Sequence, residues 1–359
     1  MGWVATGCHH SSHGADAGTG VATTPMELSL LAGTLRAGYG HEDGVGPAAR
    51  FAYPSGIATD RAGNVYVADT FGPTIRKITP DGVVSTIAGS TSGNLDGAGA
   101  AAKFRKPVGI AVDNAGTIFV TDMDNANVRR ITADGRVTTL TAINIQSGSC
   151  VSQNDAGVTF NRPMGVVVDN TGNAYVADWS DRTIQKVTPD GIVSTFVGGC
   201  GGVGQDPEHV DGVGGAARMV EPYGLARDFS GNIFVSDQWD NTIRKVTPDR
   251  VVSTVAGKAG ESGENDGQGT EARFNAPEGI AVDSAGNIYV ADEQNGLLRK
   301  ITPKGKVSTL VTGAQIWKFS GLEANGGLGW SVSAVAVDDA GTIYVADAAN
   351  CVIWKITPA

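Results

Sequence analysis

One sequence pattern occurs six times along the chain and constrains the fold more than any other feature. Its first copy is Gly56–Asp69, with the sequence GIATDRAGNVYVAD. The later copies are Gly109–Asp122, Gly165–Asp178, Gly224–Asp237, Gly279–Asp292 and Ala334–Asp347. The first aspartates of successive copies (Asp60, Asp113, Asp169, Asp228, Asp283, Asp338) are 53, 56, 59, 55 and 55 residues apart. So regular a period indicates one structural unit that is stacked or arranged in a ring.

Each unit predicts four short β-strands, which we letter a to d along the chain. In the first unit, strand a (GIATD) is followed by a tight turn and by strand b (NVYVAD), which is rich in β-branched and aromatic residues. Strand c is Thr74–Thr79, and a Pro-Asp-Gly turn precedes strand d at Val83–Ala88. Four-stranded sheets repeated around an axis form a β-propeller, for which about 40–50 residues per blade are usual.

The two ends of the chain predict how the ring closes. The sixth unit ends after strand c, whereas Glu27–Gly33 (ELSLLAG) matches the strand d pattern of Val83–Gly89 (VVSTIAG). We therefore predict an all-β fold over residues 26–359. It is a six-bladed β-propeller with four-stranded blades, in which the N-terminal strand completes the last blade.

The repeated unit resembles the NHL repeat, because GIAVD-x-x-GN-[IV]-YVAD is followed by IRKITPDG. The match runs from about Met26 to the C-terminus. The segment DGxGxxAxF, at Asp43–Phe51, Asp96–Phe104 and Asp266–Phe274, is similar to bacterial NHL proteins. The resemblance implies a scaffold used in extracellular sensor or adhesion domains and in protein- or RNA-binding modules. A minority of related propellers are lyases or lactonases, so the fold alone does not decide the function.

The charge of the chain argues against some partners. It has 37 acidic and 27 basic residues and a net charge of −10, whereas domains that bind nucleic acid normally carry a basic surface. Nucleic acid is therefore not an expected partner. No apolar run reaches the roughly 20 residues of a membrane span, so no transmembrane segment is expected.

Repetition separates scaffold residues from candidate site residues. The aspartates that recur at the ends of strands a and b are interpreted as turn-forming groups that accept hydrogen bonds from backbone amides. A second recurring set occupies the next-to-last position of the DGxGxxAxF segment, which ends in Phe51, Phe104 and Phe274 but in Met219 before blade 4. It is interpreted as the partner of the loop aspartate: Arg50, Lys103, Arg218 and Arg273.

The b-to-c turns and the d-to-a connections should emerge together around one end of the central channel, which we call the mouth face. They carry aromatic and charged residues where a structural turn would take small polar ones. The predicted ligand-binding residues are Phe71, Trp179, Trp239, Tyr53, Tyr223, Trp330, Arg162 and Glu221, and Glu278 and Glu293 lie at related positions. Aromatic rings around a loop-built mouth suit a sugar, an aromatic compound or a peptide. The alternative is that these rings pack over glycine-rich loops and hold them in place.

Two histidines, His41 and His209, are the candidates for catalysis or metal binding within the propeller. They precede blades 1 and 4, on opposite sides of a ring of six, whereas zinc requires ligands within about 2–2.3 Å of one ion. The resemblance implies that propeller lyases use several converging histidines, and this pair falls short of that number. No cofactor is expected. Calcium or another divalent ion bound through an Asp-Gly-x-Gly loop remains an alternative.

The cysteines and the N-terminal segment bear on location. Cys150 and Cys200 lie in consecutive d-to-a connections and are a candidate disulfide, a bond that persists in oxidising compartments. Residues 1–25 are predicted to be a flexible tail or linker. Their Val4–Cys8 segment resembles the end of a bacterial lipoprotein signal, in which Cys8 would carry lipid, although the basic start and apolar core of a signal peptide are missing. We expect a cell-envelope or extracellular location.

Together these features favour a non-enzymatic binding or scaffold propeller. Its mouth face would meet a protein, peptide or carbohydrate ligand. The alternative is a small-molecule lyase or hydrolase whose site lies at the same mouth.

Overall fold

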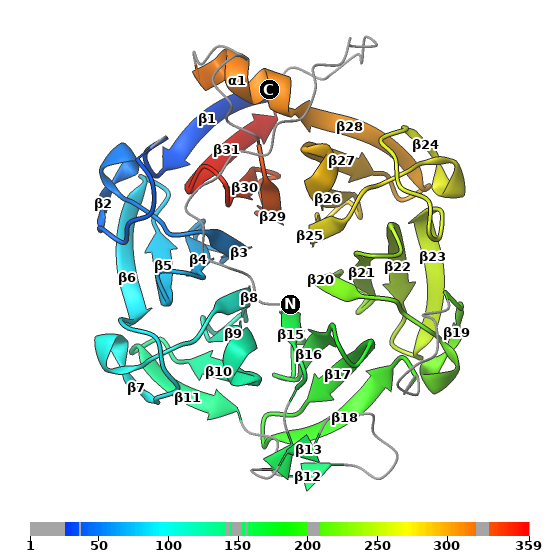
Figure 1. Ribbon diagram of the computed structural model, residues 1–359, viewed down its shortest axis with the longest axis horizontal. Helices are drawn as coiled ribbons and strands as arrows, with labels where there is room; N and C mark the ends of the chain where they lie inside the picture. Colours follow the sequence, from blue (N-terminus) through cyan, green and yellow to red (C-terminus); the bar gives the residue numbers. More distant parts are fainter. Residues whose placement is uncertain are drawn as a thin grey trace.

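The computed structural model describes residues 26–35, 37–140, 144–145, 153–154, 157–158, 160–199, 209–320 and 330–358. Six antiparallel sheets are arranged in a ring around a central axis, as Figure 1 shows. The prediction of an all-β, six-bladed propeller is confirmed.

Each blade is a meander whose first strand lies nearest the axis. Strands a to d are β3 (Pro54–Thr59), β4 (Val65–Asp69), β5 (Thr74–Ile78) and β6 (Val83–Gly89) in blade 1. They are β8 (Pro107–Val112), β9 (Ile118–Asp122), β10 (Asn127–Ile131) and β11 (Arg136–Leu140) in blade 2. In blade 3 they are β15 (Pro163–Val168), β16 (Ala174–Asp178), β17 (Thr183–Val187) and β18 (Ile192–Val197).

The second half of the ring repeats this arrangement. Blade 4 consists of β20 (Pro222–Arg227), β21 (Ile233–Asp237), β22 (Thr242–Val246) and β23 (Val251–Gly257). Blade 5 consists of β25 (Pro277–Val282), β26 (Ile288–Asp292), β27 (Leu297–Ile301) and β28 (Lys306–Thr312). Blade 6 consists of β29 (Val332–Val337), β30 (Ile343–Asp347), β31 (Val352–Pro358) and the N-terminal strand β1 (Met26–Ala32).

Ring closure follows the prediction. Strand β1 pairs antiparallel with β31, and the register runs from Met26 opposite Pro358 to Ala32 opposite Ile353. The last blade therefore contains the two ends of the described chain, side by side (Figure 1).

The outer edges of the blades carry elements that the repeat pattern did not predict. A two-residue strand pairs with strand d in blades 1, 2, 4 and 5, namely β2 (Gly44–Val45), β7 (Gly97–Ala98), β19 (Gly212–Val213) and β24 (Gly267–Gln268). Blade 3 gains β12 (Asn144–Ile145) in parallel pairing, beside a short hairpin of β13 (Gln153–Asn154) and β14 (Gly157–Val158).

Short helices accompany these connections and turns. An eight-residue helix, α1 (Gly313–Ser320), follows β28 at the rim. Short 3-10 helices occupy Gly46–Ala48, Gly99–Ala101, Met123–Asn125, Gly214–Ala216, Gly269–Glu271 and Glu293–Asn295.

The inner strands approach one another so closely that a glycine is required in each of five blades. A Cβ atom on Gly109 would lie 2.1 Å from the backbone oxygen of Met164 in the next blade, and one on Gly56 would lie 2.0 Å from that of Val108. These contacts place five glycines of the repeat at the axis, where the inner strands of neighbouring blades touch.

The aspartate at the end of strand a has the predicted turn-forming role. In blade 1, Asp60 Oδ1 accepts hydrogen bonds of 2.9 Å from the backbone N–H groups of Ala62 and Asn64. The aspartate that ends strand b has another role, because Asp69 accepts a 2.6 Å hydrogen bond from the Ala52 N–H in the connection before strand a.

A buried arginine on strand c joins the interblade loop to the sheet. The Arg76 guanidinium donates to Asp43 at 2.7 Å and to Asp69 at 3.4 Å, and lies 5.1 Å above the centre of the Phe51 ring. Arg129, Arg244 and Arg299 make the same pair of contacts in blades 2, 4 and 5.

The prediction that the loop aspartate pairs with the basic residue of the same segment was therefore wrong in these blades. The loop aspartate pairs with the arginine of strand c, because that side chain points back under the loop. Arg50 instead donates to the backbone oxygens of Ala37 and Tyr39.

Candidate functional site

The d-to-a connections and the b-to-c turns meet on one face of the ring. The residue before strand a accepts a backbone hydrogen bond from the turn of its own blade. The bonds are Thr70 to Tyr53 at 3.2 Å, Trp179 to Arg162 at 3.0 Å and Gln238 to Glu221 at 2.9 Å. This arrangement confirms the prediction that both sets of loops build the mouth face.

Four side chains from three blades influence one another at the centre of this face. Tyr53 precedes β3, Tyr223 and Glu278 are the second residues of β20 and β25, and Glu293 begins the turn after β26. Burial raises the pKa of the Tyr53 and Tyr223 hydroxyls above their usual range, and the Glu278 and Glu293 carboxylates raise both further. Side chains from blades 1, 4 and 5 are therefore near enough at this face to affect one another's ionisation.

The Glu278 carboxyl also has a strongly perturbed environment. Burial, followed by repulsion from Glu293, raises its pKa well above the usual value, while a hydrogen bond from Gln238 opposes the shift. That bond runs from Gln238 Nε2 to Glu278 Oε1 at 2.9 Å, and Ser331 Oγ donates to Glu293 Oε1 at 3.3 Å. The entrance thus holds one carboxyl that retains its proton at a pH where an ordinary glutamate is ionised.

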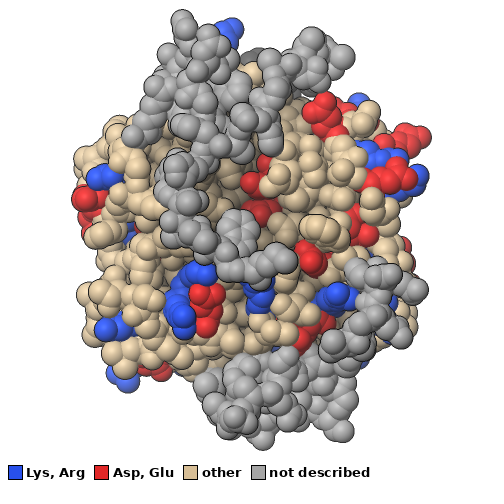
Figure 2. Space-filling view, viewed as in Figure 1, with Lys and Arg blue, Asp and Glu red and all other residues tan. Residues whose placement is uncertain are grey.

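Blade 3 contributes a basic group to the mouth face. The Arg162 guanidinium lies 4.7 Å from the centre of the Trp179 ring. Burial raises the pKa of the neighbouring Glu221 carboxyl, and Asp237 adds to this shift, whereas Arg182, Trp179 and Arg162 oppose it. Acidic and basic side chains therefore both lie around the centre of this face, as Figure 2 shows.

The predicted aromatic residues fall into different environments. Trp239 is 71% exposed, whereas Trp179 is half-buried beside Arg162. Phe71 packs between Tyr53, at 5.0 Å between ring centres, and Tyr39, at 5.9 Å.

Trp330 corrects one expectation. It is only 5% exposed and belongs to the apolar core between blades 5 and 6, so the expectation that it is presented to a ligand was wrong. It shares that buried cluster with Val332, Val311 and Leu298, which is the packing role weighed as the alternative.

The two histidines do not share a site. His41 is exposed just before β2, and His209 is partly buried just before β19, on the other side of the ring (Figure 1). His209 Nδ1 is hydrogen-bonded to Asp240, and its Nε2 lies 2.8 Å from Thr254 Oγ1. Gly72 takes the place of Asp240 in blade 1, so the equivalent carboxylate partner is missing beside His41.

In blade 4 the Asp240 carboxylate, the His209 imidazole and the Thr254 hydroxyl lie in a row that resembles a nucleophile triad. However, Thr254 Oγ1 donates its hydrogen to Asp211 at 3.0 Å, and Thr86 makes the same contact with Asp43 at 2.9 Å in blade 1. The threonine is therefore part of the repeated scaffold. A carboxylate at that distance would also repel an oxyanion formed at the hydroxyl.

Several sequence-based expectations concern metal ions and the N-terminal segment. Within the described ranges, no three His, Cys, Asp or Glu side chains are grouped so that they could hold a metal ion. No helix among the described residues is long and apolar enough to cross a membrane. Cys8, Cys150, Cys200 and the segment 1–25 lie outside the described residues.

Comparisons with known sequences find NHL proteins. A model of the teneurin NHL domain matches residues 34–96, and a model of the NHL repeat matches residues 274–301. NHL repeat-containing protein 2 of Bos taurus is 28% identical over 294 residues, which cover 71% of this chain and 40% of that protein. The chloroplastic protein SUPPRESSOR OF QUENCHING 1 of Arabidopsis thaliana is 27% identical over 298 residues, covering 76% of this chain and 27% of that protein. The chain thus spans less than half the length of these relatives.

Solved structures share the fold at low sequence identity. An auxiliary nutrient binding protein from Bacteroides thetaiotaomicron has a TM-score of 0.66 and 16% identity, covering 92% of this chain and 76% of that one. A gluconolactonase from Xanthomonas campestris has a TM-score of 0.60 and 14% identity, covering 93% and 90%. A streptogramin B lyase has a TM-score of 0.57 and 12% identity, covering 95% and 100%. The chain is therefore a six-bladed β-propeller whose repeats match the NHL repeat and whose sequence is similar to NHL repeat-containing proteins.

Proposed function

We propose that this propeller is a non-enzymatic binding protein that takes a ligand or a protein partner at its mouth face. The observation that carries the proposal is that Tyr53, Tyr223, Glu278 and Glu293, from three different blades, are near enough at this face to affect one another's ionisation. A scaffold turn needs none of these side chains, and the other blades place serine, valine or methionine where Tyr223 and Glu278 stand: Ser55, Val108, Met164 and Ser333.

The chemistry of the entrance indicates what would bind there. Carboxyl groups and tyrosine hydroxyls at its centre accept hydrogen bonds from hydroxyl or amine groups, and aromatic rings supply apolar contact. Trp239 adds a large exposed surface on the same face. These groups suit a peptide or carbohydrate-type ligand with several hydrogen-bond donors, or a loop of a protein that presents them.

The experiment is a binding screen with glycans, peptides and metabolites, read by tryptophan fluorescence and repeated with variants. We expect Glu278→Gln and Tyr223→Phe to weaken binding at least tenfold, because both lose polar groups at the entrance. Trp239→Ala would weaken the binding of a protein or peptide. The matched control is Phe229→Ala, since Phe229 is 79% exposed but follows strand a of blade 4, on the opposite face. Equal binding by wild type and all mouth variants would overturn the proposal.

A lyase or hydrolase site at the mouth is the second candidate, and the raised pKa of Glu278 favours it. A carboxyl whose pKa is raised by burial can serve as a general acid. Incubation with lactones and cyclic depsipeptides, followed by mass spectrometry, would test it. Turnover that disappears in Glu278→Gln would establish this candidate, and binding without turnover would leave the non-enzymatic proposal in place.

We also propose a cell-envelope or extracellular location, supported by the Val4–Cys8 pattern and by the cysteine pair Cys150 and Cys200. Labelling of cells with a fatty-acid analogue would detect lipid on Cys8, and Cys8→Ser should remove the label. Peptide mapping without reduction would test the disulfide.

A further inference from the structure

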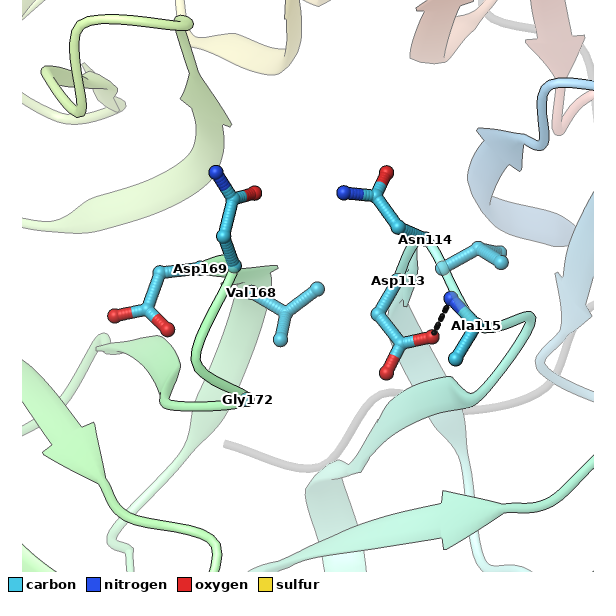
Figure 3. Close-up of a pocket in the computed structure, with 8 residues that line it drawn as sticks. Asp113, Asn114, Ala115, Val168, Asp169 and Gly172 are labelled. Carbon is cyan, nitrogen blue, oxygen red and sulfur yellow. Dashed lines mark hydrogen bonds between the residues drawn. The ribbon is translucent and has the colours of Figure 1, made fainter.

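A second candidate site lies at the opposite end of the propeller from the mouth. Its hollow, of about 170 Å³, lies between the turns that join strands a and b in blades 2 and 3. Figure 3 shows Asp113, Asn114 and Ala115 on one side of the space and Val168, Asp169 and Gly172 on the other. In a meander these turns and the mouth loops lie at opposite ends of the strands.

Asp113 differs from its five counterparts in the other blades. The aspartate at this position normally uses Oδ2 to accept a hydrogen bond from an asparagine amide, a tyrosine hydroxyl or both. The pairs are Asp60 with Asn64 and Tyr66, Asp169 with Asn173 and Tyr175, Asp228 with Asn232, Asp283 with Asn287 and Tyr289, and Asp338 with Tyr344. Blade 2 alone has both Thr117 and Phe119 at these positions.

The turn of blade 2 forms without this second oxygen. Asp113 Oδ1 accepts hydrogen bonds of 2.8 Å from the backbone N–H groups of Ala115, which Figure 3 shows, and of Thr117, as Asp60 does from Ala62 and Asn64 in blade 1. Asp113 Oδ2 accepts no hydrogen bond from any residue that the structure describes. The scaffold therefore leaves one carboxylate oxygen available at the hollow, in the only blade that has lost both donors.

The other groups around the hollow offer mixed chemistry. Asn114 and Asn170 are exposed, and each carboxamide provides an acceptor oxygen and an NH₂ donor. Val112 and Val168 add apolar surface. Asp169 contributes no further acceptor of this kind, because both of its oxygens already accept hydrogen bonds within its own turn.

The geometry points to a binding site for a neutral polyhydroxylated molecule, of the size of one monosaccharide, between the a-to-b turns of blades 2 and 3. A ligand hydroxyl would donate to Asp113 Oδ2, neighbouring hydroxyls would exchange hydrogen bonds with Asn114 and Asn170, and a C–H face would contact the valines. The hollow, of about 170 Å³, is smaller than the roughly 300–1,000 Å³ of pockets for drug-sized ligands, which favours a single ring.

Other ligand classes fit the same groups less well. Calcium requires six to eight oxygen ligands, and neither the amide NH₂ groups nor the valines could contribute to it. An anion would meet the Asp113 carboxylate. A neutral polyol uses donors, acceptors and apolar surface together.

The test measures binding of glucose, galactose, mannose and N-acetylglucosamine by saturation-transfer NMR and calorimetry. Asp113→Asn keeps the turn acceptor Oδ1 and replaces only the available oxygen with an NH₂ group, so we expect at least tenfold weaker binding. The double variant Thr117→Asn with Phe119→Tyr restores the two donors found in other blades. It should also abolish binding, while the melting temperature stays unchanged or rises. Asp283→Asn is the control, because Asp283 occupies the same turn position in blade 5, away from the hollow.

The results separate this site from the mouth. A sugar that binds wild type, Asp283→Asn and the mouth variant Glu278→Gln equally, but neither of the two blade 2 variants, supports the proposal. It is overturned if none of the sugars binds the wild type, or if Asp113→Asn or the double variant binds as the wild type does. Calcium binding that Asp113→Asn removes, with no sugar binding, would overturn it in favour of a cation site.

Discussion

Replacing Arg76 with methionine tests how far the buried arginines hold the propeller together. The guanidinium donates to Asp43 at 2.7 Å, to Asp69 at 3.4 Å, and to the backbone oxygens of Arg50 and Glu42 at 2.9 and 3.0 Å. The side chains of Arg76 and Asp69 are both fully buried. Methionine keeps much of the apolar contact but leaves the Asp69 carboxylate without its cation.

Breaking a buried ion pair by removing one partner costs about 3–5 kcal/mol. We therefore expect Arg76→Met to lower the free energy of unfolding by about this amount, measured by urea denaturation at pH 8. The matched control is Lys77→Met, one residue along the same strand. Its ammonium is half-buried and 5.7 Å from the Tyr66 ring centre, so its loss should cost about 1 kcal/mol or less.

The pH provides a second measurement on the same variant. Burial raises the pKa of Asp69 to about 7, and Arg76 opposes that shift. With a pKa of about 7, Asp69 is already protonated at pH 5 and needs no cation there, and without Arg76 its pKa rises further. The destabilisation by Arg76→Met should thus be smaller at pH 5 than at pH 8. A loss below about 1 kcal/mol at pH 8, or a loss that is larger at pH 5, would refute the reasoning. Should the variant fail to fold, Asp43→Asn provides the milder test, because Asp43 is half-exposed and Asp69 keeps its arginine.

Three further predictions concern the axis, the pH dependence and the indole rings. Gly109→Ala should destabilise the fold strongly, because its Cβ would lie 2.1 Å from the Met164 oxygen, whereas Gly215→Ala should be nearly neutral, since its closest contact is 3.9 Å; thermal denaturation of the two variants compares them. Burial and repulsion from Asp181 raise the pKa of Asp178 to about 6, above the roughly 3.9 of an unfolded chain. Its contribution to stability is therefore complete below pH 4 and declines by about 3 kcal/mol as the pH rises through 6, and Asp178→Asn should show a correspondingly shallower decline in urea titrations from pH 4 to 7. Trp330→Ala should cost about 3–5 kcal/mol as a core truncation, while Trp239→Ala should change stability by less than about 0.5 kcal/mol; equal denaturation midpoints for the two would contradict their assigned burial.

The sequence was sufficient to predict the ring of blades because the sequence pattern of one blade is repeated six times. A glycine recurs at the position of Gly109 and an aspartate at the position of Asp60. Each repetition indicates that the backbone needs this residue there, which a single copy would leave ambiguous. The closure of the ring through Met26–Ala32 followed from the same comparison, since one strand was missing at one end and present at the other.

The candidate site was harder to predict because it depends on differences between copies. Trp239 and Trp330 are both indoles in loops of the mouth face, and only packing shows that one is exposed and the other buried. The electrostatic effect of Glu278 on Tyr53 arises between blades 5 and 1, and no local pattern encodes it. The pairing of Arg76 with Asp43 also escaped prediction, since the side-chain direction on strand c decides it.

The pairing of β1 with β31 has a consequence for how the molecule can be made and altered. Strands near the two ends of the described chain form one hydrogen-bonded seam, so blade 6 cannot be completed until its last strand has been synthesised. Blades 1 to 5 can therefore form in order during synthesis, before β1 pairs with Val352–Pro358. The same adjacency makes this propeller suited to circular permutation. Joining the ends beside Met26 and Pro358 and opening the chain in the exposed turn at Asp81 should preserve every blade while moving the last folding step to blade 1.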